Sequence, residues 1–143
     1  MLIRDLLQHK PNDLIDVSPD DDIRRAARLM VDNAVSVLIV ETEDGELAGI
    51  LTERDLARYF AAHGNGTSAA VRDAMTIDVM TCSAQHRVAK IAAVMSESNI
   101  RHLPVLTKGR VEAVVSIGDI VQFHMSQLEE ENRTLRDLVA VLD

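Results

Sequence analysis

Two stretches of the chain share one pattern of residues. Residues 16–40 align on residues 81–105 with a shift of 65, and residues 49–56 align on residues 113–120 with a shift of 64. One register that runs through most of both halves indicates two copies of a single structural unit. The chain therefore has to fold as a pair of similar halves.

Each copy has the same predicted order of helix, hairpin and helix. Helices are expected to begin at Ser18, with Pro19 as the first helical residue, and at Ser83. The predicted strands are residues 35–40 and 47–51 in the first copy and residues 101–106 and 111–115 in the second. Gly-containing turns at residues 43–46 and 108–109 separate the strands of each hairpin. Thr52 and Ser116 start the second helix of each copy.

These elements predict an α/β (α+β) fold of two pseudo-symmetric helix–hairpin–helix repeats. A lone unit would leave one face of its sheet uncovered, so the two copies are expected to pack sheet to sheet as one domain. The predicted organisation is a first repeat at residues 1–63, a linker at 64–70, a second repeat at 71–124 and a C-terminal helix at 125–143.

Charge and composition exclude several classes of protein. The formal net charge of −8 and the 2 % aromatic content disfavour nucleic-acid binding, which draws on basic patches and stacking side chains. No apolar stretch is long enough to span a membrane, and the N-terminus lacks a signal-peptide core. Cys82 is the only cysteine and the histidines are dispersed, so no metal site and no disulfide are predicted. A cytoplasmic protein is expected.

The most informative motif closes each copy. An apolar strand is followed by Thr52-x-x-Asp55 in the first copy and by Ser116-x-x-Asp119 in the second. This spacing is that of a helix capping box. A helix N-terminus also suits phosphate, and a nearby carboxylate can accept hydrogen bonds from ribose hydroxyls. Because the pair occurs twice beside an expected inter-repeat cleft, the repeat favours ligand binding in addition to capping.

The motifs resemble those of CBS domains. The likeness rests on Ser-Pro-Asp, Val-Ser-Val-Leu-Ile-Val and Gly-Ile-Leu-Thr-Glu-Arg-Asp in the first copy, and on Ile-Arg-His-Leu-Pro-Val and Val-Val-Ser-Ile-Gly-Asp in the second. It covers roughly residues 1–124, and the doubling is similar to the tandem pair called a Bateman module. The resemblance implies binding of adenosine derivatives, with the acid of each motif holding ribose.

Carried over by position, the resemblance implies two unequal sites. The first site is expected to use Thr52, Arg54, Asp55, Ser83, Val88, Ile100, Arg101 and His102. The second is expected to use Ser18, Ile23, Val35, Ser36, Ser116 and Asp119. Arg54 and Arg101 are candidate phosphate ligands in the first site. No matching cation stands at the aligned positions of the second, so the second is expected to be the weaker.

The resulting hypothesis is a non-catalytic sensor that binds AMP, ADP, ATP or an NAD-type ligand and acts on a partner protein. AMP is the preferred ligand, and no cofactor is required. No nucleophilic, phosphate-loop or metal motif indicates an enzyme. The alternative function is a structural adaptor whose clefts are vestigial.

The tail allows two interpretations. Leu128, Leu135 and Leu142 recur every seven residues, while Glu131 or Asn132 interrupts the pattern. The helix either packs back on the module or forms a dimer seam. The family resemblance favours a homodimer independently of the tail.

Overall fold

The computed structural model describes residues 1–10, 14–64 and 68–142. Linker residues 65–67 and Asp143 of the expected C-terminal segment lie outside that range. The elements in chain order are α1 (Ile3–Leu7), β1 (Asp16–Val17), α2 (Ile23–Asn33), β2 (Val37–Glu41), β3 (Leu47–Thr52), α3 (Glu53–His63), α4 (Val71–Ala74), β4 (Cys82–Ser83), α5 (Val88–Ser98), β5 (His102–Thr107), β6 (Arg110–Ser116) and α6 (Ile117–Leu142).

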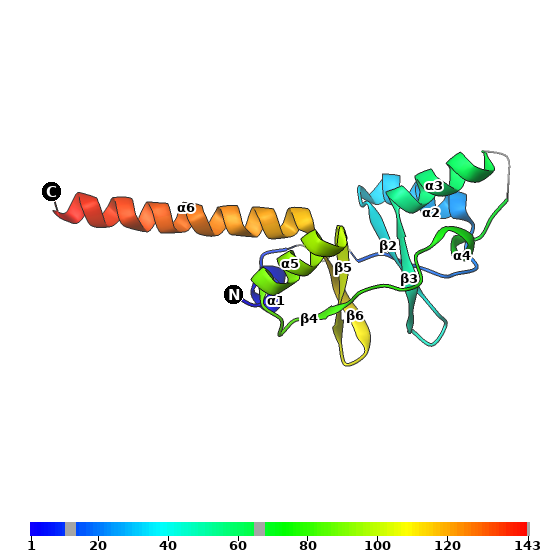
Figure 1. The fold of residues 1–143 in the computed structure, drawn as a ribbon, viewed down its shortest axis with the longest axis horizontal. Coiled ribbons are helices and arrows are strands. Elements are labelled where there is room, and N and C mark those ends of the chain that lie inside the picture. The colour runs from blue at the N-terminus through cyan, green and yellow to red at the C-terminus, as the bar shows by residue number, and fades with distance from the viewer. Residues whose placement is uncertain (11–13, 65–67, 143) are drawn as a thin grey trace.

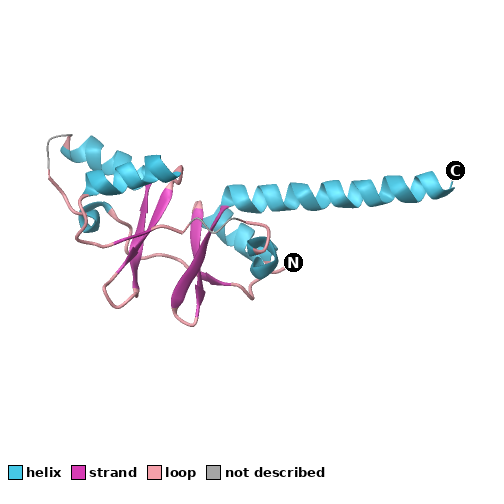
Figure 2. Cartoon of the chain, turned by 180° about the vertical axis from the view of Figure 1, so that it is seen from behind, coloured by secondary structure: helices cyan, strands magenta, loops and turns pink. Residues whose placement is uncertain are grey.

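Two three-stranded sheets lie between two groups of helices (Figure 1). The first sheet has the order β1-β2-β3 and the second β4-β5-β6, each with one parallel and one antiparallel pairing. Helices α2 and α3 cover the outer side of the first sheet, and α5 and the start of α6 cover that of the second (Figure 2). The predicted α+β pair of repeats, packed sheet to sheet, is confirmed.

Two helices begin later than the sequence predicted. Ser18 does not cap α2; its Oγ accepts the Asp20 N–H in a preceding turn, and Asp22 caps the helix through the Arg24 N–H at 2.7 Å. Ser83 belongs to β4, and α5 begins at Val88. Both serines close local turns instead, because a short side chain bonds the N–H two residues ahead.

The two short N-terminal helices of the repeats are exchanged. Helix α1 precedes the first copy, yet Ile3 and Leu6 are buried in the core of the second half. Helix α4 precedes the second copy, yet Val71 is buried in the core of the first. The Ile3 N–H donates to the His86 carbonyl at 2.9 Å, and the Val71 N–H donates to the Asp21 carbonyl at 2.8 Å. Each core is therefore completed by the chain segment that precedes the other repeat.

The segment after α4 crosses the edge of the first sheet. Thr76 and Ile50 exchange backbone hydrogen bonds at 2.9 and 3.0 Å. Gly49 permits this approach, since a Cβ built there would lie 2.3 Å from the Thr76 carbonyl oxygen. The crossing fixes Thr76 beside the start of α3.

Helix α6 is one continuous helix of 26 residues. Its first turns pack on the second half, where Ile120 is buried and Phe123 half-buried. Beyond Gln127 every described residue is exposed, and the helix extends away from the module (Figure 1). Packing of the tail back on its own module, one of the two interpretations of the sequence, does not occur. No helix in the described part of the chain is long and apolar enough to cross a membrane.

Candidate functional site

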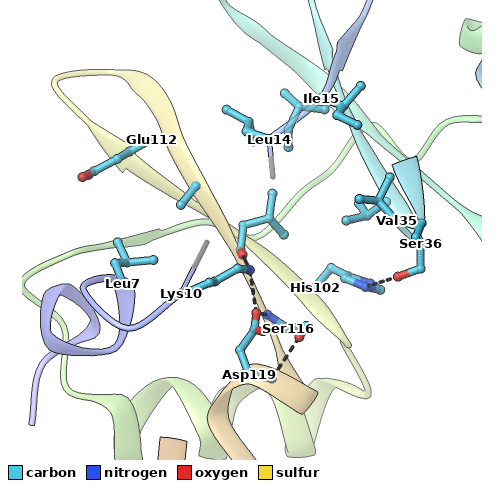
Figure 3. A pocket seen from close by; sticks show the side chains of 15 residues that line it. Leu7, Lys10, Leu14, Ile15, Val35, Ser36, His102, Glu112, Ser116 and Asp119 are labelled. Atoms are coloured by element: carbon cyan, nitrogen blue, oxygen red, sulfur yellow. Dashed lines mark hydrogen bonds and ion pairs between the residues drawn. The ribbon is translucent and has the colours of Figure 1, made fainter. Parts of the chain in front are cut away.

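A cavity of about 330 Å³ lies between the two repeats at the start of α6 (Figure 3). Its walls are Leu7, Lys10, Leu14, Ile15, Ala34, Val35, Ser36, Val37, Ile39, His102, Glu112, Ala113, Val114, Ser116 and Asp119. Aliphatic side chains of the first half face polar groups at the base of the second. A cavity of this size and mixed lining suits a small ligand with an apolar and a polar end.

Asp119 stands at the polar end of the cavity. It forms a reciprocal capping box with Ser116, whose N–H donates to Asp119 Oδ2 at 2.8 Å while Ser116 Oγ accepts the Asp119 N–H at 3.0 Å. Lys10 Nζ also donates to Oδ2, at 2.6 Å. Among the described residues none donates to Oδ1, so one carboxylate oxygen keeps its accepting capacity for a ligand.

The ionised form of Asp119 is favoured. Burial alone would raise the pKa of this carboxyl, but the hydrogen bonds from Lys10 and Ser116 outweigh it and hold the pKa below its usual range. Asp119 is therefore a charged acceptor at neutral pH, with its side chain 25 % exposed.

Lys10 is the residue that sequence reasoning missed. The positions of the second site that align with Arg54 and Arg101 hold no cation, and Lys10 lies outside the aligned ranges. Lys10 follows α1, and the exchange of α1 onto the second half carries its ammonium group to Asp119 and to the Val114 carbonyl. The apolar residues Ile3 and Leu6 indicate that the segment before Lys10 packs into a core. The sequence does not indicate which of the two cores they join.

His102 joins the two halves across the cavity. Its Nε2 lies 3.0 Å from Ser36 Oγ, which is the pair drawn at the right of Figure 3. Burial lowers the pKa of the imidazole, with opposing charges from Asp119 and Lys10. The sequence assigned His102 to the first site and Ser36 to the second, but the structure brings them together at the second.

Asp55 has a different environment. It is only 8 % exposed; its Oδ2 accepts the Thr52 N–H at 2.9 Å and its Oδ1 accepts the Thr76 hydroxyl at 3.0 Å. Thr52 Oγ1 in turn accepts the Asp55 N–H at 3.1 Å. Both oxygens of this carboxylate are thus engaged within the chain, whereas Asp119 retains one.

Some of the predicted site residues line the cavity and the others lie elsewhere in the fold. Val35, Ser36, Ser116 and Asp119 line the cavity, as does His102. Ile23 is fully buried in the first core, and Ser18 lies in the turn before α2. Val88 and Ile100 pack half-buried against the second core, Ser83 lies in β4, and Arg54 and Arg101 are exposed.

A second cavity of about 310 Å³ adjoins the first between α1 and α6. Lys10 and Asp119 line both, so their ion pair stands between the two spaces. His9 and Phe123 form another part of its wall, with ring centroids 6.1 Å apart. Within residues 1–10, 14–64 and 68–142, no group of His, Cys, Asp and Glu side chains is placed to hold a metal ion.

The chain matches a known protein family in both of its repeats. The CBS domain family model matches residues 3–62 and 71–126. CBS domain-containing protein YhcV of Bacillus subtilis is 30 % identical over 110 residues, which cover 77 % of this chain and 78 % of YhcV. The mitochondrial protein CBSX3 of Arabidopsis thaliana is 33 % identical over 121 residues, and the match spans 81 % of this chain but 59 % of CBSX3.

Solved structures agree with the fold. The CBS-domain containing protein ATU1752 of Agrobacterium tumefaciens has a TM-score of 0.80 at 34 % identity, with 85 % of this chain and 91 % of that chain covered. The CBS domain pair of protein MJ0100, solved in complex with 5′-methylthioadenosine and S-adenosyl-L-methionine, has a TM-score of 0.78 at 28 % identity and covers 89 % and 98 %.

Proposed function

Because this chain belongs to the CBS domain family, we propose that its inter-repeat cavity binds an adenine nucleotide and that the chain acts as a regulatory module. The observation that supports this proposal most directly is Asp119. It is an ionised carboxylate at the polar end of the cavity, and its Oδ1 accepts no hydrogen bond from the described residues. In this proposal the chain is not an enzyme; it works in the cytoplasm as a homodimer and passes occupancy to a regulated protein.

Ribose is the group that fits Asp119. A carboxylate that accepts hydrogen bonds from both hydroxyls of a ribose favours a nucleoside over a bare aromatic base. The aliphatic walls at Ile15, Val35 and Ile39 suit the faces of an adenine ring. The MJ0100 pair binds two ligands that share an adenosine portion, which supports the same assignment here.

Lys10 favours a phosphorylated ligand. Its ammonium lies at the ribose-binding carboxylate, and a phosphate there would accept a charge-assisted hydrogen bond in exchange for the Asp119 contact. The same positive charge disfavours a cationic sulfonium such as that of S-adenosylmethionine. We therefore rank AMP, ADP, ATP and NAD-type ligands above neutral or cationic adenosine derivatives.

This proposal ranks the Asp119 site above the Asp55 site, the reverse of the order expected from sequence. The reason is the cation at Asp119 and the Thr76 hydroxyl at Asp55. The first-site residues Arg54 and Arg101 are exposed and can therefore still contact a phosphate. Both sites stay in the proposal, and the Asp55 site is the weaker of the two.

Calorimetric titration of AMP into four proteins tests the ranking: wild type, Asp119→Asn, Lys10→Met and the matched control Asp55→Asn. Hydrogen bonds to charged groups contribute about 1.5–3 kcal/mol. Asp119→Asn should therefore weaken AMP binding roughly tenfold to a hundredfold, while Asp55→Asn, at the weaker site, should leave the tighter binding step in place. Lys10→Met should weaken AMP more than adenosine.

Two results would count against the proposal. Loss of AMP binding in Asp55→Asn with retention in Asp119→Asn would assign the nucleotide to the other repeat boundary. Absence of heat and of thermal stabilisation with millimolar AMP, ADP, ATP and NAD would leave the adaptor function, in which the clefts are vestigial.

A further inference from the structure

The exposed part of α6 carries an unusual surface for a solvated helix. Leu128, Leu135 and Leu142 are 52 %, 61 % and 85 % exposed, and no described part of the chain covers them. These three leucines line neither of the two cavities. A row of large apolar side chains in water is a surface that normally meets a partner.

The row keeps heptad spacing throughout, with the polar Asn132 as the one interruption of its apolar character. Spacings of four and three residues alternate through Val121, Met125, Leu128, Asn132, Leu135, Val139 and Leu142. In heptad terms, Val121 and the three leucines occupy d, while Met125, Asn132 and Val139 occupy a. Leucine at d with a β-branched residue at a favours two-stranded parallel coiled coils, and a single Asn at a fixes register and oligomeric state.

The seam is available while α6 stays docked on its module. Ile120 and Phe123, which pack on the second half, lie at positions c and f. At 3.6 residues per turn their side is about 160° around the helix from the a/d row. A second helix can therefore pack along the seam without displacing α6 from its own core.

We propose that α6 pairs with α6 of a second copy of this chain as a parallel, in-register leucine zipper. In a parallel pair Asn132 meets Asn132 of the partner subunit, and the two amides can hydrogen-bond each other. In an antiparallel pair the a positions face d positions, so Asn132 would face a leucine and leave a polar group unpartnered.

Charges beside the seam support the parallel arrangement. Residues at g of one helix face residues at e of the next heptad in a parallel partner. Glu131 at g would face Arg136 of the partner subunit, and His124 at g would face Glu129 of the partner subunit. The first pair joins opposite charges, the second places an imidazole beside a carboxylate that can accept its N–H, and all four residues are exposed.

Cysteine cross-linking of the full-length chain tests orientation. Val139→Cys places a thiol at an a position near the end of the helix, and the matched control Ala140→Cys places one at the neighbouring b position, which faces away. A parallel pair brings the two Val139→Cys thiols together, so this variant should form a disulfide-linked dimer at least tenfold faster than the control. An antiparallel pair separates them by most of the seam length.

The native cysteine does not interfere. Cys82 is buried, which raises the pKa of its thiol to about 11, so it stays protonated and unreactive near pH 8. Equal cross-linking rates of Val139→Cys and Ala140→Cys, or sedimentation of the wild type as a 15.8 kDa monomer at micromolar concentration, would overturn the proposal.

A charge exchange tests the flanking pairs without nucleotide, so its outcome is separate from that of the proposed function. In the Val139→Cys background, Glu131→Lys alone and Arg136→Glu alone each place like charges face to face. Each should weaken the pairing of the two helices and slow disulfide cross-linking severalfold. The double variant restores opposite charges and should recover the rate. A double variant no faster than the single variants would refute the parallel g–e′ register.

Discussion

Replacing Lys10 by methionine removes the ammonium from Asp119 while keeping most of the aliphatic stem. In the folded chain Lys10 Nζ donates to Asp119 Oδ2 at 2.6 Å, and the two side chains are 23 % and 25 % exposed. Fully exposed ion pairs contribute about 0–1 kcal/mol, whereas breaking a buried one costs about 3–5 kcal/mol. This pair lies between the two cases, so we expect a loss of about 1–2 kcal/mol in the free energy of unfolding at pH 7.

The pH dependence identifies the source of that loss. The pKa of Asp119 is depressed in the folded chain, so the pair stabilises the fold above the unfolded pKa and this contribution is lost as pH falls through the folded pKa. In Lys10→Met the pKa of Asp119 should be higher than in the wild type, because only the Ser116 hydrogen bonds remain to oppose burial. The difference in unfolding free energy between wild type and variant should be largest at neutral pH. It should begin to shrink below the unfolded value of about 4 and continue to shrink as pH falls through the lower folded pKa of the wild type.

Urea denaturation of wild type, Lys10→Met, Asp119→Asn and the double variant checks this as a double-mutant cycle. The exposed Lys90→Met on α5 is the matched control, since it changes the same charge away from the cavity. A coupling energy near zero at pH 7, or a wild-type advantage that does not narrow in acid, would refute the assigned role of the pair.

Two further predictions concern residues beside the cavity and the crossing segment. Burial lowers the pKa of His102, so the stability that comes from its neutral imidazole is present above the unfolded value near 6.5 and is lost as pH falls below it. In His102→Gln the free energy of unfolding in urea should change less between about pH 7 and 5 than in the wild type. An unchanged slope would contradict the assignment. Gly49→Ala forces a Cβ against the Thr76 carbonyl and should lower the free energy of unfolding by about 1–3 kcal/mol in thermal denaturation. Gly118→Ala is the control, since a Cβ there would have its nearest contact at 3.6 Å, and it should be neutral or stabilising. Equal melting temperatures of the two variants would show that the crossing segment moves to accommodate the methyl group.

The hairpins and their following helices could be predicted from the sequence because local signals determine them. Gly45 and Gly109 adopt positive φ at the turns, and Thr52 and Ser116 cap helices whose first residues are Glu53 and Ile117. The two-residue strands β1 and β4 escaped prediction, since pairs such as Asp16 and Val17 become strands only by pairing with a distant partner.

The ranking of the two acids was beyond the sequence for a related reason. Asp55 and Asp119 occupy equivalent motif positions and have the same local capping box. What separates them is a threonine from the segment after α4 and a lysine from the segment after α1. Neither contact has a local signal, because both depend on which core each short helix joins.

That exchange also sets an order of events during synthesis. The first half can complete its core once Val71 has left the ribosome, but α1 has its docking surface only after β4, β5, β6 and the start of α6 have been made. At about 5–20 residues per second the nascent chain carries Ile3 and Leu6 without their core for several seconds. Helix α1 is thus among the last segments to be buried, and a nascent chain from which only α4 and the residues before it have emerged holds a complete first core beside an exposed apolar helix.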